Sequence, residues 1–284
     1  MTRTVYVNGD YVPEDEARIS VFDRGFLMAD AVYEVTAVID GKLIDFPGHM
    51  ARLRRSLGEL ELTSPVDEAE MEAIHREMMA RNALEEGCIY LQITRGAADR
   101  DFAFPENATP SLVLFTQARD VAESRTGREG IKVVTLPDIR WGRRDIKTVQ
   151  LLAPSMAKMA AKNAGKDDAW MVEDGHVTEG SSNNAYIVTR EGVIVTRDLS
   201  NAILHGITRA AVLAFAREAQ MRVEERPFTV AEAHDAAEAF ITSASAFVTP
   251  VIEIDGEPVG DGAPGPVAKR LREIYLAESL KHAS

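Results

Sequence analysis

Lys147 is the residue of this sequence whose type and setting first suggest covalent chemistry. It stands in Arg144-Asp145-Ile146-Lys147-Thr148, directly before the largely apolar run 149–154. A lysine in apolar surroundings has a lowered pKa, and its neutral amine can form a Schiff base with a carbonyl compound. On the local sequence alone, a solvated lysine at a strand end is the simpler interpretation. Lys147 therefore needs support from other parts of the chain.

The second candidate is Glu179, the one carboxylate in the small polar stretch Val177-Thr178-Glu179-Gly180-Ser181-Ser182-Asn183-Asn184. A carboxylate in such a place could keep a pyridinium nitrogen protonated, so that the ring acts as an electron sink. The stretch precedes an expected strand at 185–188, and taken alone it fits an ordinary polar loop. Glu179, like Lys147, is a candidate only in combination.

A third candidate lies at the start of an expected helix, where Gly206-Ile207-Thr208-Arg209 opens a segment that continues to Gln220. A helix N-terminus presents free N–H groups and a favourable dipole to a phosphate, and Thr208 adds a hydroxyl. The alternative is a plain helix start with Thr208 as a capping residue. Together the three stretches supply a lysine for an aldehyde, a carboxylate for a ring nitrogen and a cradle for a phosphate, which are the needs of a single ligand.

The elements that must position these residues begin with hairpins. Turns at Asn8-Gly9-Asp10 and Asp40-Gly41 are each flanked by apolar strands. Apolar residues at helical spacing predict a helix from about Pro47, and a second helix is expected over 67–82. Two strands follow, at 89–94 and 112–116.

The second part of the chain mixes short strands with helices and shows no regular βαβ alternation, which predicts an α+β fold. Thr229 and Glu232 have capping-box spacing and predict one helix start. The polar segment between the two parts is expected to be a linker. We therefore predict a smaller N-terminal α+β domain over 1–120, a linker over 121–130 and a larger C-terminal domain over 131–284. Further strands are expected at 131–135, 169–172, 185–188 and 193–195, and further helices at 155–164, 207–220 and 265–280.

Composition and missing motifs exclude several classes of protein. The 284 residues carry a net charge of −13, which argues against nucleic acids and anionic membranes as main partners. P-loop, dinucleotide, HExxH and CxxC motifs are absent, so neither a metal site nor a nucleotide site is expected. The N-terminus lacks a signal-peptide pattern, and no stretch approaches the length of about 18 apolar residues that spans a membrane. The single cysteine, Cys88, is expected to pack in a strand and fits a reducing cytoplasm.

Taken in order, Asp145-Ile146-Lys147, Thr178-Glu179-Gly180-Ser181-Ser182 and Gly206-Ile207-Thr208-Arg209 resemble the class IV aminotransferases. This family comprises D-amino-acid transaminases, branched-chain transaminases, aminodeoxychorismate lyases and (R)-amine transaminases. By pattern the chain is most similar to bacterial D-amino-acid transaminases, which implies the two-domain fold of the family. The resemblance runs nearly end to end and includes Asp23-Arg24-Gly25, Val32-Tyr33-Glu34, Thr94-Arg95-Gly96, Phe104-Pro105-Glu106-Asn107, Asp138-Ile139-Arg140-Trp141 and Thr249-Pro250-Val251-Ile252-Glu253-Ile254-Asp255-Gly256.

The resemblance implies pyridoxal 5′-phosphate as cofactor, bound by the larger C-terminal domain. Lys147 would carry the cofactor as a Schiff base and shuttle a proton between the substrate Cα and the cofactor C4′. Glu179 would pair with the pyridine nitrogen. Ala244 stands where the closest relatives carry threonine, so only its backbone N–H would serve. The remaining implied cofactor contacts are Arg52 to the phosphate, Ser182, Leu204 against the ring, Ile207 and Thr208 at the helix start, and Ser243 beside Ala244.

On the substrate side the resemblance implies Tyr33 and Arg100. Tyr33 would help to hold the substrate carboxylate, and Arg100 would reach the active site of the neighbouring subunit in a homodimer. Arginine suits this task because it can bond to both carboxylate oxygens. Two residues beyond that arginine, D-amino-acid transaminases commonly carry histidine, whereas this chain has Phe102. Loss of one charge-assisted bond would cost about 1.5–3 kcal/mol, or roughly ten- to a hundredfold in carboxylate binding.

The leading hypothesis is a D-amino-acid transaminase with a D-alanine-like donor and 2-oxoglutarate or pyruvate as acceptor. Three other reactions on the same scaffold stay open: those of an aminodeoxychorismate lyase, a branched-chain transaminase and an (R)-amine transaminase. Phe102 makes the pocket less polar, which is a reason to test amine donors. A cofactor-free binding protein is the non-enzymatic alternative and would leave Lys147 idle.

Overall fold

The computed structural model describes residues 2–284, which form two compact units. The first unit comprises the chain as far as Asp120 together with the short segments Ile146–Gln150 and His282–Ser284. The second comprises Val121–Asp145 and Leu151–Lys281. Lys147 therefore belongs to the first unit, although the stretches of chain that flank Ile146–Gln150 belong to the second.

The segment 121–130, for which a linker is predicted, packs within the second unit. It contains the short helix α4 (Arg125–Glu129). The Arg272 guanidinium of helix α8 (Pro266–Lys281) donates hydrogen bonds to the carbonyls of Val121 and Ala122 at 3.0 and 2.6 Å. Gly127 lies so close that an added Cβ would be 2.5 Å from the Arg272 Cζ. A buried arginine thus holds this segment to the body of its unit.

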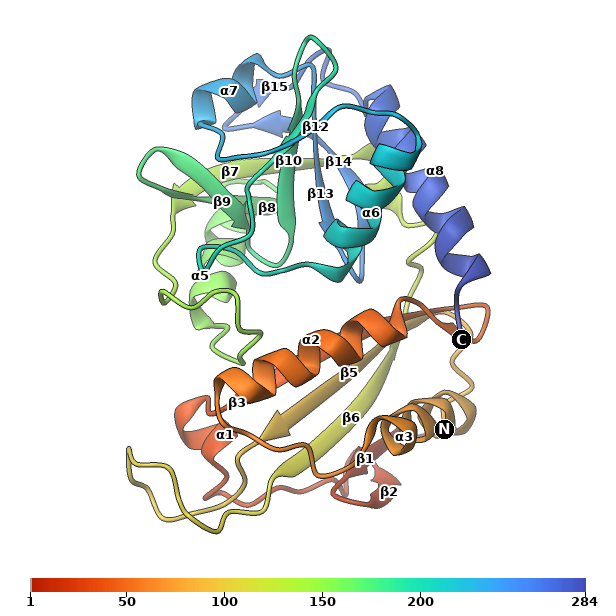
Figure 1. Cartoon of the computed structure of the whole chain (residues 1–284), viewed down its shortest axis with the longest axis vertical. Helices are drawn as coiled ribbons and strands as arrows, with labels where there is room; N and C mark the ends of the chain where they lie inside the picture. The colour runs from red at the N-terminus through yellow and green to blue at the C-terminus, as the bar shows by residue number, and fades with distance from the viewer. Residues whose placement is uncertain (1) are drawn as a thin grey trace. The chain divides into compact units, whose positions relative to one another are not determined.

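An antiparallel sheet of six strands forms the base of the first unit (Figure 1). Both predicted hairpins are confirmed, because β1 pairs with β2 and β3 pairs with β4. Asn8 and Asp40 start the two turns with positive φ values of 50° and 51°, which asparagine and aspartate tolerate better than most residues. The order is β2-β1-β6-β5-β3-β4, with strands β1 (Thr4–Val7), β2 (Asp10–Pro13), β3 (Ala31–Ile39), β4 (Lys42–Leu43), β5 (Gly87–Thr94) and β6 (Ser111–Ala118).

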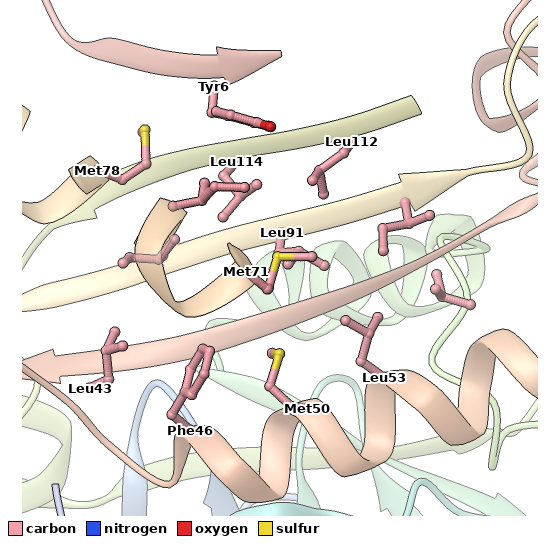
Figure 2. Close-up of a cluster of buried hydrophobic side chains, with 14 of the residues drawn as sticks. Tyr6, Leu43, Phe46, Met50, Leu53, Met71, Met78, Leu91, Leu112 and Leu114 are labelled. Carbon is pink, nitrogen blue, oxygen red and sulfur yellow. The ribbon is translucent and has the colours of Figure 1, made fainter. Parts of the chain in front are cut away.

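Helices α2 (Phe46–Glu59) and α3 (Glu68–Arg81) pack their apolar side chains into one core with the sheet. Pro47 lies in the first turn of α2, where a missing N–H costs nothing. Figure 2 shows Phe46, Met50 and Leu53 pointing from α2 toward the strands. Full burial of a side chain of this size stabilises the fold by about 1.5–3 kcal/mol. A third helix, the short α1 (Arg24–Met28), was not predicted and is capped by the Asp23 carboxylate.

The other face of this sheet carries a row of aromatic rings. Side chains alternate between the two faces along a strand, so Tyr33 lies opposite to its neighbour Glu34. The Tyr33 ring stacks on Tyr90 with centroids 5.5 Å apart, and Tyr90 stacks on Phe115 at 4.8 Å. On the same strand as Tyr90, Cys88 is buried in β5, as predicted. The sheet thus presents a row of stacked aromatic rings across β3, β5 and β6.

A mixed sheet of nine strands forms the second unit. Its parallel pairs are β7–β8, β7–β14 and β11–β12, and the other pairs are antiparallel. The two sheets and the absence of regular βαβ alternation confirm the predicted α+β class. The order is β12-β11-β10-β13-β14-β7-β8-β9 with β15 beside β14, and the strands are β7 (Ile131–Pro137), β8 (Asp168–Glu173), β9 (His176–Gly180), β10 (Asn184–Val188), β11 (Ile194–Thr196), β12 (Val223–Glu225), β13 (Glu238–Ser243), β14 (Phe247–Ile254) and β15 (Glu257–Pro258).

Three more helices complete the second unit: α5 (Leu152–Asn163), α6 (Ile207–Glu218) and α7 (Val230–Asp235). The predicted capping box of α7 is confirmed, because the Glu232 amide donates to Thr229 Oγ1 and the Thr229 amide donates to the Glu232 carboxylate. Helix α6 starts at Ile207, as predicted, and packs against α8 (Figure 1). Among residues 2–284, no helix has both the length and the apolar character needed to cross a membrane.

Candidate active site

Lys147 is fixed on a short segment that pairs with β3. Thr148 forms a bridge with Val32, and the Tyr33 amide donates to the Lys147 carbonyl at 3.0 Å. On the other side, the Lys147 amide donates to Ser56 Oγ of α2 at 3.3 Å. The half-buried side chain extends over the Tyr33 ring, with Nζ 4.1 Å from the ring centroid. An amine held against an aromatic face differs from the freely solvated lysine that the local sequence favoured.

Arg52 lies one helical turn before Ser56 on α2 and is almost fully buried. Its Nε and Nη2 donate to the two oxygens of Glu34 at 2.8 and 2.7 Å, and His49 Nδ1 lies 2.8 Å from the same carboxylate. Burial alone would raise the pKa of the Glu34 carboxyl, but Arg52 and His49 hold that pKa well below its ordinary value. Glu34 is therefore ionised and keeps the Arg52 guanidinium in one orientation. The predicted phosphate contact of Arg52 stays a prediction.

Arg100 lies in the loop between β5 and β6 and is exposed. Its guanidinium carbon is 5.5 Å from the centroid of the Phe102 ring, and that ring is itself 79% exposed. No carboxylate of the described residues forms an ion pair with Arg100. In the first unit the structure thus brings Lys147 and Tyr33 together, and it leaves Arg100 open at the surface of a loop.

Glu179 is the centre of the site residues in the second unit. It lies in β9, is 3% exposed and accepts three hydrogen bonds. Arg140 Nη1 donates to one carboxylate oxygen, and the other accepts from Asn184 Nδ2 at 2.9 Å and from the Leu204 amide at 3.0 Å. A carboxylate has about four lone-pair sites, so one acceptor position remains. As a carboxylate, Glu179 can only accept, so a further partner at that position would have to be a hydrogen-bond donor.

Burial raises the pKa of the Glu179 carboxyl, while the Arg140 guanidinium and the Leu204 amide oppose that rise. Arg140 also bonds to Asp138, from Nη2 to Oδ2 at 2.7 Å and from Nε to Oδ1 at 3.0 Å. Burial would raise the pKa of Asp138 too, but Arg140 and Thr178 lower it below its ordinary value. Although burial disfavours its charge, the pKa of Arg140 is raised by the two carboxylates between which it lies. Arg140 is thus a permanent positive charge beside Glu179.

The start of α6 has the features of an anion cradle. Gly206 is the N-cap and offers no side chain to the first N–H groups of the helix. An added Cβ at Gly206 would lie 2.1 Å from Asn184 Oδ1, so any other residue there would have to displace the Asn184 side chain, which bonds to Glu179. Thr208 is 2% exposed, and its Oγ1 has no hydrogen-bond partner within the described part of the chain. A buried hydroxyl without a partner costs about 1–3 kcal/mol, and a bound phosphate oxygen would satisfy it.

The remaining predicted contacts surround Asn184 on neighbouring strands. Ser182 is exposed in the turn between β9 and β10, and Asp168 holds that turn by accepting from Ser181 Oγ and from Asn183 Nδ2. Asn184 of β10 pairs with Thr242 of β13. Ser243 ends β13, and Ala244 follows it in the turn to β14. Leu204 and Ile207 flank Gly206 and are partly exposed.

Sequence reasoning missed four residues that hold these side chains. Arg140 and Asn184 bond to Glu179, and Glu34 and His49 bond to Arg52. Arg140 had only one signal, its position two residues after Asp138, which does not reveal a partner 39 residues away. His49 and Arg52 are one turn apart in a predicted helix, so a shared carboxylate could have been proposed for them.

Comparison with known proteins identifies the family of this chain. The family model described as amino-transferase class IV matches residues 31–254. A D-alanine aminotransferase of Staphylococcus aureus (strain MW2) is 38% identical over 272 residues, which are 95% of this chain and 96% of that protein. A D-alanine aminotransferase of Bacillus licheniformis is 37% identical over 281 residues, covering 98% and 99%. The chain belongs to the class IV aminotransferases.

Solved structures show the same fold. A branched-chain amino acid aminotransferase of T.th. with pyridoxamine 5′-phosphate has a TM-score of 0.89 and 28% identity, covering 98% of this chain and 94% of that chain. The branched-chain amino acid aminotransferase of Escherichia coli has a TM-score of 0.90 with 22% identity, over 98% and 94% of the two chains, and supports the fold alone. The predicted family and its fold are confirmed.

Proposed function

We propose that this chain is a pyridoxal-phosphate-dependent transaminase that moves an amino group between a D-alanine-like D-amino acid and a 2-oxo acid such as 2-oxoglutarate or pyruvate. The observation that carries this proposal is the near full-length identity of 37–38% with D-alanine aminotransferases. Branched-chain aminotransferases share the fold at lower identity, 28–29% in two of the solved structures. Their similarity therefore supports a branched-chain reaction less well.

The residues of the second unit fit the cofactor. Glu179 accepts from three donors and has one acceptor position left, which as a carboxylate suits the protonated nitrogen of a pyridine ring. The N-terminus of α6 and the unsatisfied Thr208 Oγ1 suit a phosphate. Ile207, Thr208, Ser243 and the Ala244 amide would share that phosphate, with Arg52 as its positive partner. Leu204 and Ser182 would border the ring.

When bound, pyridoxal phosphate supplies a carbonyl for amines and a ring that accepts electrons from the substrate Cα. Lys147 would supply the amine that holds the cofactor, and its free amine would serve as the base and acid for the proton on the substrate Cα. The Tyr33 ring and the pairing with β3 restrict where Lys147 Nζ can reach. Burial raises the pKa of the Glu179 carboxyl and Arg140 opposes that rise, so Arg140 favours the carboxylate form that would pair with a protonated ring nitrogen.

The proposed substrate contacts are Tyr33 and Arg100. Both sit in the first unit, and both can face a carboxylate, one through a hydroxyl and the other through a guanidinium. Phe102 stands where a histidine would add a further hydrogen bond, and it is largely exposed on the same loop. An apolar ring beside Arg100 favours one second candidate, an (R)-amine transaminase whose donor lacks a carboxylate.

A donor panel tests the proposal. Purified enzyme with pyridoxal phosphate and 2-oxoglutarate is supplied with D-alanine, with L-leucine or with (R)-1-phenylethylamine, and aminodeoxychorismate is supplied alone. We expect D-alanine to give the highest kcat/KM. Turnover confined to L-leucine would make the chain a branched-chain enzyme, and release of 4-aminobenzoate would make it a lyase. A preference for the carboxylate-free amine would establish the second candidate.

We propose a homodimer in which Arg100 of one subunit serves the site of the other. Support comes from Arg100, which lies exposed on its loop and forms no ion pair with a carboxylate of the described residues. A reducing compartment, the cytoplasm, fits the buried free thiol of Cys88. Small amino and oxo acids are the proposed partners, with no nucleic acid and no membrane.

Subunit mixing tests the shared site. Lys147→Ala and Arg100→Ala variants are each expected to be nearly inactive at low substrate concentration. Unfolding and refolding them together in equal amounts should restore about one quarter of the wild-type sites, because half of the dimers are mixed and each mixed dimer has one intact site. If Arg100 served its own subunit, mixing would restore nothing. Each variant refolded alone is the control.

A further inference from the structure

Two buried arginines share one carboxylate at the base of the loop that carries Arg100. Arg24 Nε donates to Asp30 Oδ2 at 2.7 Å. Arg95 donates to the same carboxylate from Nε at 2.7 Å and from Nη2 at 3.1 Å. The arginine side chains are 3% and 8% exposed and the Asp30 side chain is 9% exposed. Two guanidinium groups against one carboxylate leave an excess positive charge that needs other partners.

Those other partners come from the Arg100 loop and from the end of α2. Arg24 Nη1 donates to the Asp101 carbonyl at 2.6 Å. Arg95 donates to the carbonyls of Leu60 and Glu61 at 2.7 and 3.2 Å. The Phe104 ring lies over Arg95, with the guanidinium carbon 3.6 Å from the ring centroid. The contacts to the Asp101 carbonyl and to the Phe104 ring hold the loop just after Arg100.

The Phe104 ring also faces Arg24, whose guanidinium carbon is 5.8 Å from the ring centroid. The electron-rich face of an aromatic ring attracts a cation, and the attraction is stronger when the cation is shielded from water. Phe104 is still 53% exposed, so burial of the ring alone explains its fixed position poorly. Its contact with two buried cations accounts for that position.

We propose that Phe104 is a positioning residue that, with Arg24 and Arg95, clamps the loop so that the Arg100 guanidinium meets the substrate carboxylate. The proposal rests on the proposed function through the role of Arg100. The Asp101 carbonyl and the Phe104 ring hold the loop one and four residues after Arg100, so movement at either would displace its guanidinium. A wrongly placed arginine weakens binding of a carboxylate substrate without changing the cofactor chemistry.

The test compares Phe104→Leu, which keeps an apolar side chain without a π face, with Phe104→Tyr, which keeps the π face. One readout is chymotrypsin cleavage of the holoenzyme after Phe102, followed by mass spectrometry, because proteolysis reports local opening. Phe104 itself is followed by proline and should not be cut. We expect Phe104→Leu to be cut about tenfold faster at Phe102 and Phe104→Tyr to match the wild type.

The second readout is the split between KM and kcat. Phe104→Leu is expected to raise the KM for 2-oxoglutarate about tenfold with kcat within about twofold, and Phe104→Tyr to restore the wild-type KM. Unchanged cleavage and an unchanged KM in an active Phe104→Leu enzyme would overturn the clamp. Equal effects of the two variants would also overturn it, because they differ in the π face. If the wild type showed no transaminase activity but Phe104→Leu were still cut faster at Phe102, the clamp would be retained and the proposed function rejected.

Discussion

Replacing Lys147 by alanine is expected to lower kcat with D-alanine and 2-oxoglutarate by about 10³-fold or more. The physical reason is that the variant loses the amine of Lys147, whose backbone is fixed by the pairing with Tyr33 and by the Ser56 hydroxyl. The variant should still fold, since Ile146 anchors the same segment in the core. The measurement is kcat together with the mass of the protein after borohydride reduction, which traps a cofactor bound to lysine.

Lys162→Ala provides the matched control, because Lys162 is an exposed lysine of α5. The wild type and this control should each gain the mass of one reduced cofactor per chain, and peptide mapping should place it on Lys147. The Lys147→Ala variant should gain none. Trapping of the cofactor on a different lysine in the wild type would refute the assignment of Lys147.

Replacing Arg140 by glutamine is expected to weaken cofactor binding at pH 7 by about ten- to a hundredfold. Burial already raises the pKa of the Glu179 carboxyl, and Arg140 is the strongest force against that rise. Without the guanidinium the pKa rises further. The direction of the pH dependence follows from the hydrogen bond at the ring nitrogen. The protonated nitrogen donates, and only the ionised form of Glu179 can accept, so cofactor affinity is lost as pH falls through the pKa of Glu179. The acidic loss of affinity should therefore begin at higher pH in Arg140→Gln.

The cofactor dissociation constant is measured by titration between pH 5 and pH 8, a range chosen for an ordinary or raised carboxyl pKa. Arg190→Gln is the control, since Arg190 pairs with Asp235 at the surface. Glu179→Gln should bind weakly at every pH and lose the acidic dependence. An Arg140→Gln profile that overlies the wild type would show that Arg140 does not set the charge of Glu179.

The parts of the fold that the sequence could predict are those with local causes. The Asn8-Gly9 and Asp40-Gly41 turns need positive φ at the first position, and the capping box needs only Thr229 and Glu232. The stretch at 177–184 was interpreted as a polar loop, whereas Thr178 and Glu179 lie in β9. The pattern of polar and apolar residues does not predict a buried strand here, because the polar side chains are satisfied by partners from distant segments, such as Arg140.

The site shows the same limit. Lys147, Glu179 and Thr208 could be singled out because each has a chemically suggestive neighbourhood, and the family resemblance joined them. The residues that tune them could not be found in this way. Glu34 bonds to Arg52 only because β3 passes under α2, and Asn184 reaches Glu179 and Leu204 only because a tight turn places β10 beside β9. Such pairs depend on tertiary structure, and the spacing of residues along the chain does not predict them.

The most direct test of the central claim is the configuration of the amino acid that the enzyme makes. Purified enzyme with pyridoxal phosphate, D-alanine and 2-oxoglutarate is allowed to react, and pyruvate and the two glutamate enantiomers are separated and quantified. The account predicts equal amounts of pyruvate and D-glutamate, with L-alanine inactive as donor. L-Glutamate as the product, or pyruvate without any glutamate, would contradict it.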